Sequence, residues 1–201
     1  MKADTADDLF RTWNRHRRNN NCYAFAFDRL QPGADEKLQP GEVAGLPEIP
    51  DGERYQCSDL KARILKDNPG TVPLHPKEPS PTGQGHRVAL FVDNQGESRD
   101  YHFYREMPDG TWWHKPGSLP VSKLDDAGNV IRDPLEADRD YVNEGAENTN
   151  YNYATFCGFF WVPQIDRQPI DREAEDSWVV AAVALFVMLV ILFALGLLFY
   201  Y

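Results

Sequence analysis

Cys22 is the residue of this sequence best suited to covalent chemistry, because it follows the run Asn19–Asn21 at the expected start of a helix. Asparagine side chains cap helix N-termini, and the unpaired N–H groups there lower the pKa of a nearby thiol. A thiolate nucleophile also needs a base, usually a histidine on a separate element, and a polar group that orients its ring. We therefore predict Cys22 as the nucleophile and His102 as the general base, with His114 or His86 as the orienting group.

Aromatic residues surround His102 in the sequence and suit a groove for an extended ligand. In a strand alternate residues share a face, so Asp100 and Tyr104 lie on the same side as His102. We predict Asn21, Tyr104 and Trp113 as substrate-binding residues. The alternative is that the rings form the packing face of a sheet and bind nothing.

The same residues have a purely structural interpretation. A free cysteine such as Cys22 often acts as a small buried hydrophobe, and His102 can be a core histidine bonded to a backbone carbonyl. Cys57 and Cys157 form no CxxC pair, and we expect neither to be catalytic. Three imidazoles on neighbouring strands rarely converge without a carboxylate, so we expect no metal site and no other cofactor.

The N-terminal half of the chain combines helical and irregular patterns. Apolar residues recur at helical spacing over residues 7–30, with asparagines in the middle, which predicts two helices joined by a polar turn. A further short helix is expected over 57–66. Proline and glycine predict loops over 31–51 and 68–85.

The second half shows alternation with a period of two. Residues 86–93 and 100–106 predict a β-hairpin, and 111–115 a third strand. A turn precedes 129–132, and 155–162 is apolar on both faces and is expected to be a central strand. The predicted fold class is α+β, with N-terminal helices packed on an antiparallel β-meander.

The last part of the chain resembles a membrane anchor. Residues 178–201 contain no charged or amide side chain, and at about 1.5 Å per residue they can cross about 30 Å of hydrocarbon. We predict one transmembrane helix there, an acidic linker over 163–177 and a soluble domain over 1–162. The lipid bilayer is then an expected partner. The N-terminus has no apolar signal segment, so the domain is expected in the cytoplasm, where thiols stay reduced.

The charge balance excludes one class of partner. The formal net charge is −10, and nucleic-acid binding requires a face rich in lysine and arginine. The short basic cluster Arg11–Arg18 is better interpreted as a solvated helix face or a lip over an anionic partner. We therefore expect no nucleic-acid partner.

A helix that begins with cysteine, followed by β-strands that carry histidines, resembles the papain-like cysteine hydrolase fold and is similar to its NlpC-type branch. The resemblance covers residues 20 to 115. It implies a thiol nucleophile at Cys22, a base at His102, an orienting group at His114 or His86, and peptide or amide substrates. The residues Tyr23-Ala24 depart from the family, which usually has an aspartate after the cysteine.

Several strings also resemble a group of uncharacterised bacterial, phage and shell-matrix-like proteins. This likeness spans most of the predicted soluble domain and implies no activity. The strings are Asn-Cys-Tyr-Ala-Phe-Ala, Asp-Tyr-His-Phe-Tyr-Arg, Trp-Trp-His-Lys-Pro-Gly and Phe-Cys-Gly-Phe-Phe.

Two functions follow from the sequence. The first is a membrane-anchored cysteine hydrolase, a peptidase or amidase acting on a peptide or protein substrate, with Cys22 and His102 as its catalytic pair. The second is a non-catalytic binding or structural module tethered to the membrane, in which the aromatic strands contact a partner.

Overall fold

The computed structural model describes residues 6–50, 53–94, 99–142 and 150–164. All of these residues belong to one compact unit, Met1–Pro169. The predicted transmembrane helix over 178–201 lies outside the described residues. Of the predicted linker over 163–177, only residues 163 and 164 are described.

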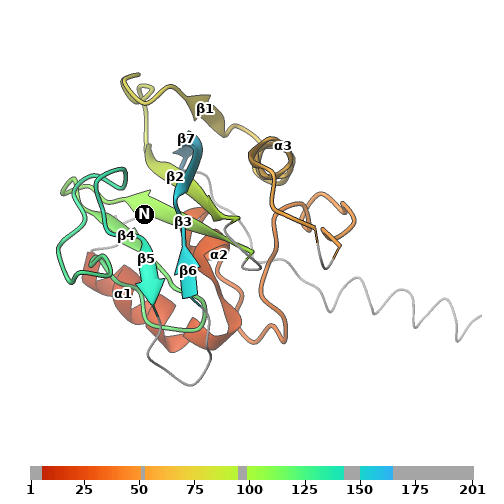
Figure 1. Ribbon diagram of the computed structural model, residues 1–201, viewed down its shortest axis with the longest axis horizontal. Helices are drawn as coiled ribbons and strands as arrows, with labels where there is room; N and C mark the ends of the chain where they lie inside the picture. Colours follow the sequence, from red (N-terminus) through yellow and green to blue (C-terminus); the bar gives the residue numbers. More distant parts are fainter. Residues whose placement is uncertain (1–5, 51–52, 95–98, 143–149, 165–201) are drawn as a thin grey trace, which may run out of the picture. The chain divides into compact units, whose positions relative to one another are not determined.

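A five-stranded antiparallel sheet dominates the described structure (Figure 1). Its strand order is β1-β7-β2-β3-β4. The strands are β1 (Val72–Leu74), β2 (Gly85–Asp93), β3 (Asp100–Glu106), β4 (Trp112–His114) and β7 (Thr155–Pro163). A separate two-stranded sheet is formed by β5 (Asp140–Val142) and β6 (Asn150–Asn152).

The hairpin at the centre of the sheet is the one that the alternating pattern predicts. Strands β2 and β3 pair in antiparallel register from Val88↔Arg105 to Asp93↔Asp100. Strand β7, from the end of the described chain, pairs with the other edge of β2. The strands expected over 86–93, 100–106 and 155–162 are therefore confirmed. At 129–132 no strand forms, and only an isolated bridge joins Leu124 to Val130.

The helices are few and short. They are α1 (Ala6–Arg15), the 3-10 helix η1 (Arg17–Asn19), α2 (Cys22–Ala26) and α3 (Cys57–Asp67). Helix α2 ends after five residues, and the chain then adopts a φ of 52° at Asp28, a value that side chains other than glycine rarely allow. The short helix expected near 57–66 is confirmed as α3.

The predicted α+β fold class, papain-like with a C-terminal transmembrane helix, is wrong. The described structure is mostly sheet with few helices. The expected meander is present as β2-β3-β4, and β7 is an internal strand as predicted, but β7 lies between β1 and β2, and β1 was expected to be loop. Alternation along a strand predicts that it will pair but carries no information on which strand it joins, so the sequence did not predict that β7 pairs with β1 and β2.

The predicted single-pass membrane architecture is corrected as well. Within the ranges that the structure describes, no helix is both long and apolar enough to cross a bilayer. Helix α3, with 11 residues, would span only about 16 Å at 1.5 Å per residue, against a hydrocarbon core of about 30 Å.

The core lies on both faces of β3. On one face the ring of Phe103 packs against Tyr23 and Phe27 at centroid distances of 5.4 and 5.6 Å. On the other face a second cluster of buried residues fills the space between the two sheets. Its members are Leu74, Ala89, Phe91, Tyr104, Trp112, Ile131, Tyr153 and Phe159. Strand β3 is therefore shielded from water on both sides.

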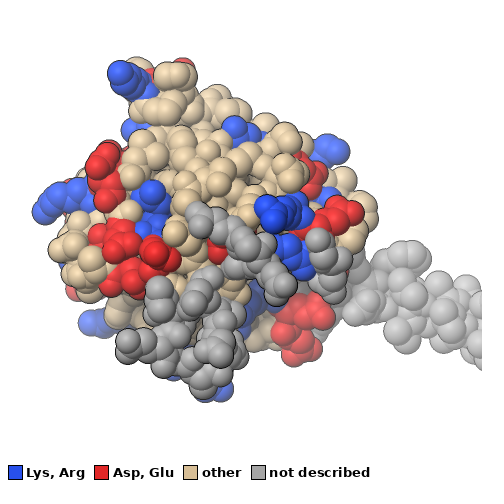
Figure 2. Space-filling model, viewed as in Figure 1, with Lys and Arg blue, Asp and Glu red and all other residues tan. Residues whose placement is uncertain are grey.

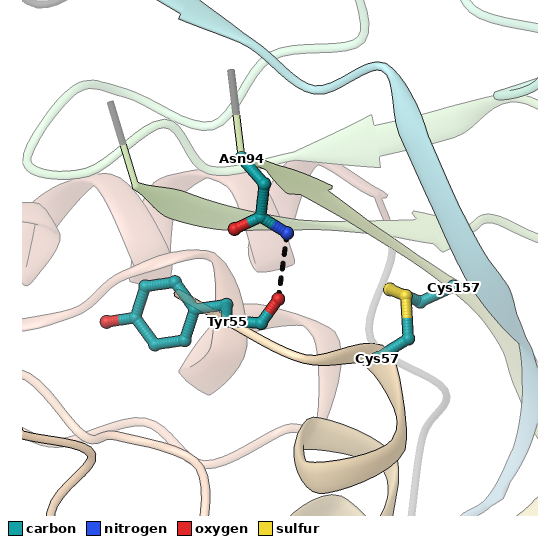
Figure 3. Close-up of a disulfide and its surroundings, with 4 residues drawn as sticks. All are labelled: Tyr55, Cys57, Asn94 and Cys157. Carbon is teal, nitrogen blue, oxygen red and sulfur yellow. Dashed lines mark hydrogen bonds between the residues drawn. A yellow bond between two sulfur atoms is a disulfide. The ribbon is translucent and has the colours of Figure 1, made fainter. Parts of the chain in front are cut away.

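A disulfide joins Cys57, the first residue of α3, to Cys157 in β7 (Figure 3). The pairing of β2 with β7 shifts between Leu90↔Gly158 and Phe91↔Phe156, so Cys157 is the extra residue of a β-bulge. Bulges redirect side chains, and here Cys157 reaches α3 with a Cα–Cα separation of 5.1 Å. Close by, the Asn94 side chain donates a hydrogen bond to the Tyr55 carbonyl at 2.9 Å.

The disulfide contradicts the expectation of reduced thiols in the cytoplasm. Disulfides form and persist in oxidising compartments and are rare in the cytosol. Cys22 is the free cysteine, and it is buried.

Removing the disulfide should weaken the fold. The bond closes a loop of 100 residues, so the double variant Cys57→Ala/Cys157→Ala should lose about 2–5 kcal/mol of unfolding free energy. Urea denaturation measures this loss, and reductant should destabilise the wild type but not the variant. Thiol titration of the unreduced, unfolded wild type should give one thiol per chain, and three would show that the bond is absent.

Candidate functional site

The side chains of β3 alternate between two environments. Tyr101 and Phe103 face α2, whereas His102 and Tyr104 face the β5–β6 side. The His102 ring stacks on Tyr153 at a centroid distance of 4.9 Å and an interplanar angle of 27°. The side chains of β3 thus alternate between the two faces as the sequence predicts, and the His102 ring lies among aromatic rings.

His102 and His114 form a hydrogen-bonded pair. Nε2 of His102 lies 2.8 Å from Nδ1 of His114, and Nε2 of His114 lies 2.9 Å from the Leu124 carbonyl oxygen. A carbonyl can only accept, so Nε2–H of His114 donates to Leu124 and its Nδ1 is left to accept from His102 when both rings are neutral. This assignment leaves Nδ1 of His102 unprotonated.

Burial keeps both imidazoles uncharged. Desolvation lowers the pKa of His102 well below its ordinary 6.5, and the neighbouring His114 lowers it further. Desolvation also lowers the pKa of His114 to about 4, although its hydrogen bond to the Leu124 carbonyl and the charge of Asp125 act in the opposite direction. Near neutral pH the pair is therefore a chain of neutral donors and acceptors.

The polar atoms around the pair bond mainly to one another. The Tyr153 hydroxyl donates to Asp100 at 2.7 Å, and the hydroxyls of Tyr104 and Tyr141 lie 3.2 Å apart. Burial raises the pKa of the Asp100 carboxyl, although the bond from Tyr153 lowers it. The Tyr104 ring stacks on His114 at 5.1 Å. The cluster resembles a satisfied polar core more than an open cleft.

Cys22 begins α2, as the sequence predicts, and Asn21 is the N-cap. The Asn21 side chain accepts a hydrogen bond from the Ala24 amide at 3.0 Å. The Cys22 sulfur lies 3.7 Å from the Tyr101 carbonyl oxygen, to which the thiol donates. Burial, followed by the charge of Asp100, raises the pKa of this thiol to about 12. The five-residue helix is too short to offset the loss of water around Cys22.

The structure brings some of the predicted catalytic residues together. His102 and His114 are bonded, so His114, not His86, is the group that holds the His102 ring. His86 instead bonds to the Ala26 carbonyl at 2.8 Å. The hydrogen bond of Cys22 goes to the main chain of β3, and among the described residues none joins its sulfur to an imidazole. The catalytic roles stay predictions.

The predicted substrate-binding residues are engaged within the fold. Besides capping α2, the Asn21 amide donates to the Leu38 carbonyl at 2.8 Å. Tyr104 is fully buried. Trp113 packs edge-on against Phe10 at 6.4 Å, and its indole N–H donates to the Thr111 hydroxyl. Their role in substrate binding also stays a prediction.

Sequence reasoning missed a buried lysine beside this site. The side chain of Lys115 is fully buried, and its ammonium donates to the carbonyls of Arg17 at 2.7 Å, Asn20 at 2.5 Å and Gly117 at 2.5 Å. Desolvation lowers the pKa of Lys115 to about 8. The signal in the sequence was its place directly after the β4 pattern and before Pro116-Gly117, where the chain turns.

A buried aspartate was missed in the same way. Asp67, the last residue of α3, accepts hydrogen bonds from the Tyr23 hydroxyl at 2.7 Å and from the amides of Gly41 at 2.6 Å and Ala44 at 2.9 Å. It therefore ties α2 and the loop before α3 to a single carboxylate. The spacing of residues along the chain cannot reveal a carboxylate that accepts several hydrogen bonds when the donors are distant in the sequence.

Comparison with known proteins places the chain in a family. No family model matches the sequence, and no solved structure matches the fold. Insoluble matrix shell protein 1 of Ruditapes philippinarum is 35% identical over 124 residues, which cover 61% of the chain and 72% of the relative. The chain belongs to the family of insoluble matrix shell protein 1. The name of this relative describes it as a matrix protein of a shell.

This kinship corrects several expectations. The expected description of the chain as a transmembrane, papain-like thiol protease is corrected: no described helix is long and apolar enough to span a membrane, and the name of insoluble matrix shell protein 1 is that of a matrix protein. The Cys22–His102 hydrolase chemistry itself stays a prediction. The expected single-pass membrane location with a cytoplasmic domain is contradicted too. The disulfide between Cys57 and Cys157 argues independently against the cytoplasm.

The neutral histidine pair predicts that acid destabilises the protein. Because the folded pKa values lie below 6.5, the unfolded chain binds more protons between pH 6.5 and about 4, and the free energy of unfolding falls as the pH falls. For His114 alone the loss is roughly 3 kcal/mol by pH 4. Urea denaturation at several pH values measures it.

Two controls separate this effect from other titrations. His114→Gln should flatten the decline, whereas His75→Gln, at an exposed position, should leave it unchanged. If His114→Gln does not fold, NMR titration of the wild type gives the same information. Ring signals of His102 or His114 that titrate near pH 6.5 would contradict the prediction.

Proposed function

We propose that this chain is a non-catalytic structural module of an insoluble protein matrix. Its kinship with insoluble matrix shell protein 1 supports the structural role. The observation that carries the proposal is the state of Cys22, which is buried, hydrogen-bonded to the Tyr101 carbonyl, and has its pKa raised to about 12. A thiol in this state does not supply the thiolate that nucleophilic catalysis requires.

The histidine pair has a structural task in this proposal. His114 links β4 to the Leu124 carbonyl, and His102 links β3 to His114, so the two rings join the sheet to the loop that follows β4. Neutral imidazoles provide these bonds without the cost of burying a charge. Stacked rings of Tyr104 and Tyr153 enclose the pair.

The disulfide suits a protein that functions in an oxidising compartment and must persist there. It joins α3 to the internal strand β7 across 100 residues, and it therefore limits how far the chain can open. Lys115 and Asp67 add internal cross-links of a different kind, since each bonds to backbone groups of separate loops. These cross-links suit a module that must resist unfolding.

Thiol reactivity tests the proposal. With the disulfide intact and the full chain folded at pH 7.5, Cys22 should react with iodoacetamide about a thousandfold more slowly than in urea, because burial raises its pKa from 9.0 to about 12. Mass spectrometry of the intact chain follows the adduct. Cys22→Ser should abolish the adduct, and His102→Gln should leave the slow rate unchanged.

A cysteine hydrolase would behave differently. Its Cys22 would react faster than a small free thiol at neutral pH, and His102→Gln would slow the reaction. That result would overturn the structural proposal.

A further inference from the structure

A pocket of about 560 Å³ lies on the opposite side of β3 from the histidine pair, bounded by the loop before α3. Tyr101 and Tyr55 line it, with their rings edge-to-face at a centroid distance of 5.1 Å. Leu46 and Ile49 add apolar surface. The Tyr101 hydroxyl donates to the Gln39 side chain at 2.5 Å, which fixes the ring in place. The volume is in the range of binding pockets in proteins.

Carboxylates outnumber cations at this pocket. Asp35, Glu36, Glu42 and Glu48 line it, against Lys37 and Arg63. The guanidinium of Arg63 is already bonded, to Asp59 at 2.8 Å and to the Pro47 carbonyl at 2.7 Å. A site with an aromatic wall and excess negative charge suits a cationic side chain with an apolar stem, above all arginine.

The chain carries a matching basic surface. Arg11 and Arg15 on α1 are one helical turn apart and share a face, and Arg17 and Arg18 follow in η1. All of these side chains are exposed, and none makes an ion pair with a described residue. Figure 2 shows positive and negative side chains in distinct small groups on the face it presents.

The basic surface is held rigidly. Trp13 of α1 is buried and packs edge-on against Phe25 of α2 at 5.2 Å. The ammonium of Lys115 binds the carbonyls of Arg17 and Asn20, directly after α1. The arginines are therefore presented on a fixed helix, which reduces the entropy lost when they bind.

We propose that the arginines of α1 and η1 in one copy of the chain dock into the acidic, tyrosine-walled pocket of a second copy. Each copy has both surfaces, so the contact can propagate from one copy to the next, as heterologous contacts do. This inference rests on the proposed structural function and names the contact by which such modules would join. It assigns the pocket a cationic protein segment as its ligand.

The sign of the salt dependence identifies this contact. Two chains of net charge −10 repel each other as whole molecules, so added salt would strengthen an association through uncharged surfaces. Association through the arginines and the pocket should instead weaken with salt. Sedimentation velocity of the full chain should show about a tenfold fall in the association constant between 0.1 and 0.5 M NaCl.

Charge reversals test the two surfaces separately. Arg11→Glu/Arg15→Glu removes the basic surface, and Asp35→Lys/Glu48→Lys removes the acidic pocket. Each double variant alone should associate at least about tenfold more weakly than the wild type. An equimolar mixture should form complexes again, because each variant retains the surface that the other lacks. Lys123→Glu/Arg132→Glu, at exposed positions outside both surfaces, is the control with the same change of charge as Arg11→Glu/Arg15→Glu, and it should associate like the wild type.

Failure of this inference can be distinguished from failure of the proposed function. A salt-insensitive association that is equal in all variants, or a wild type that does not associate, would overturn the docking proposal. In either case slow alkylation of Cys22 would leave the structural function standing. Fast alkylation would remove the structural function, whatever the association experiment shows.

Discussion

Strand β3 is covered on both faces over residues 101–104, so the buried polar groups in and next to this stretch need hydrogen-bond partners inside the protein. His102 bonds to His114, Asp100 accepts from Tyr153, and the Tyr101 carbonyl accepts from the Cys22 thiol. These bonds connect β3 to β4, to the segment after β6 and to α2. The hydrogen bonds that this one strand needs therefore tie three neighbouring elements to the sheet.

The same constraint shifts the pKa values of the residue types that are associated with catalysis. Water exclusion disfavours charge, so the imidazoles remain neutral and the thiol keeps its proton. Helix α2 places Cys22 at its first residue, but a five-residue helix has little dipole to oppose desolvation. Residue identity and local placement alone therefore suggest a reactive centre, whereas the surroundings favour a structural one.

The sequence predicts local elements well and long-range arrangement poorly. Alternation over 86–93 and 100–106 identified the central hairpin, and the asparagines before Cys22 identified the start of α2. These signals depend on neighbouring residues only. The insertion of β7 beside β2 depends on pairing between residues about 70 apart, and nothing in the alternation encodes that partner.

The residues of the candidate site also divide into those that neighbouring positions in the sequence predict and those that depend on distant contacts. Adjacent strands made His114 and His86 alternative partners of His102, and the structure selects His114, whereas the Cys57–Cys157 bond depends on a bulge that turns one side chain toward α3. Lys115 and Asp67 were missed because their partners are backbone groups of distant loops. Charged residues are usually exposed, so composition gives no reason to place these two in the interior.

The disulfide also determines what happens when the backbone is cut. Any peptide bond between Cys57 and Cys157 can be hydrolysed without separating the two resulting pieces, because the sulfur bridge still joins them. Most of the β-sheet and the whole of the loop after β4 lie within that interval. A protease that nicks this region therefore releases no fragment until a second cut or a reductant follows.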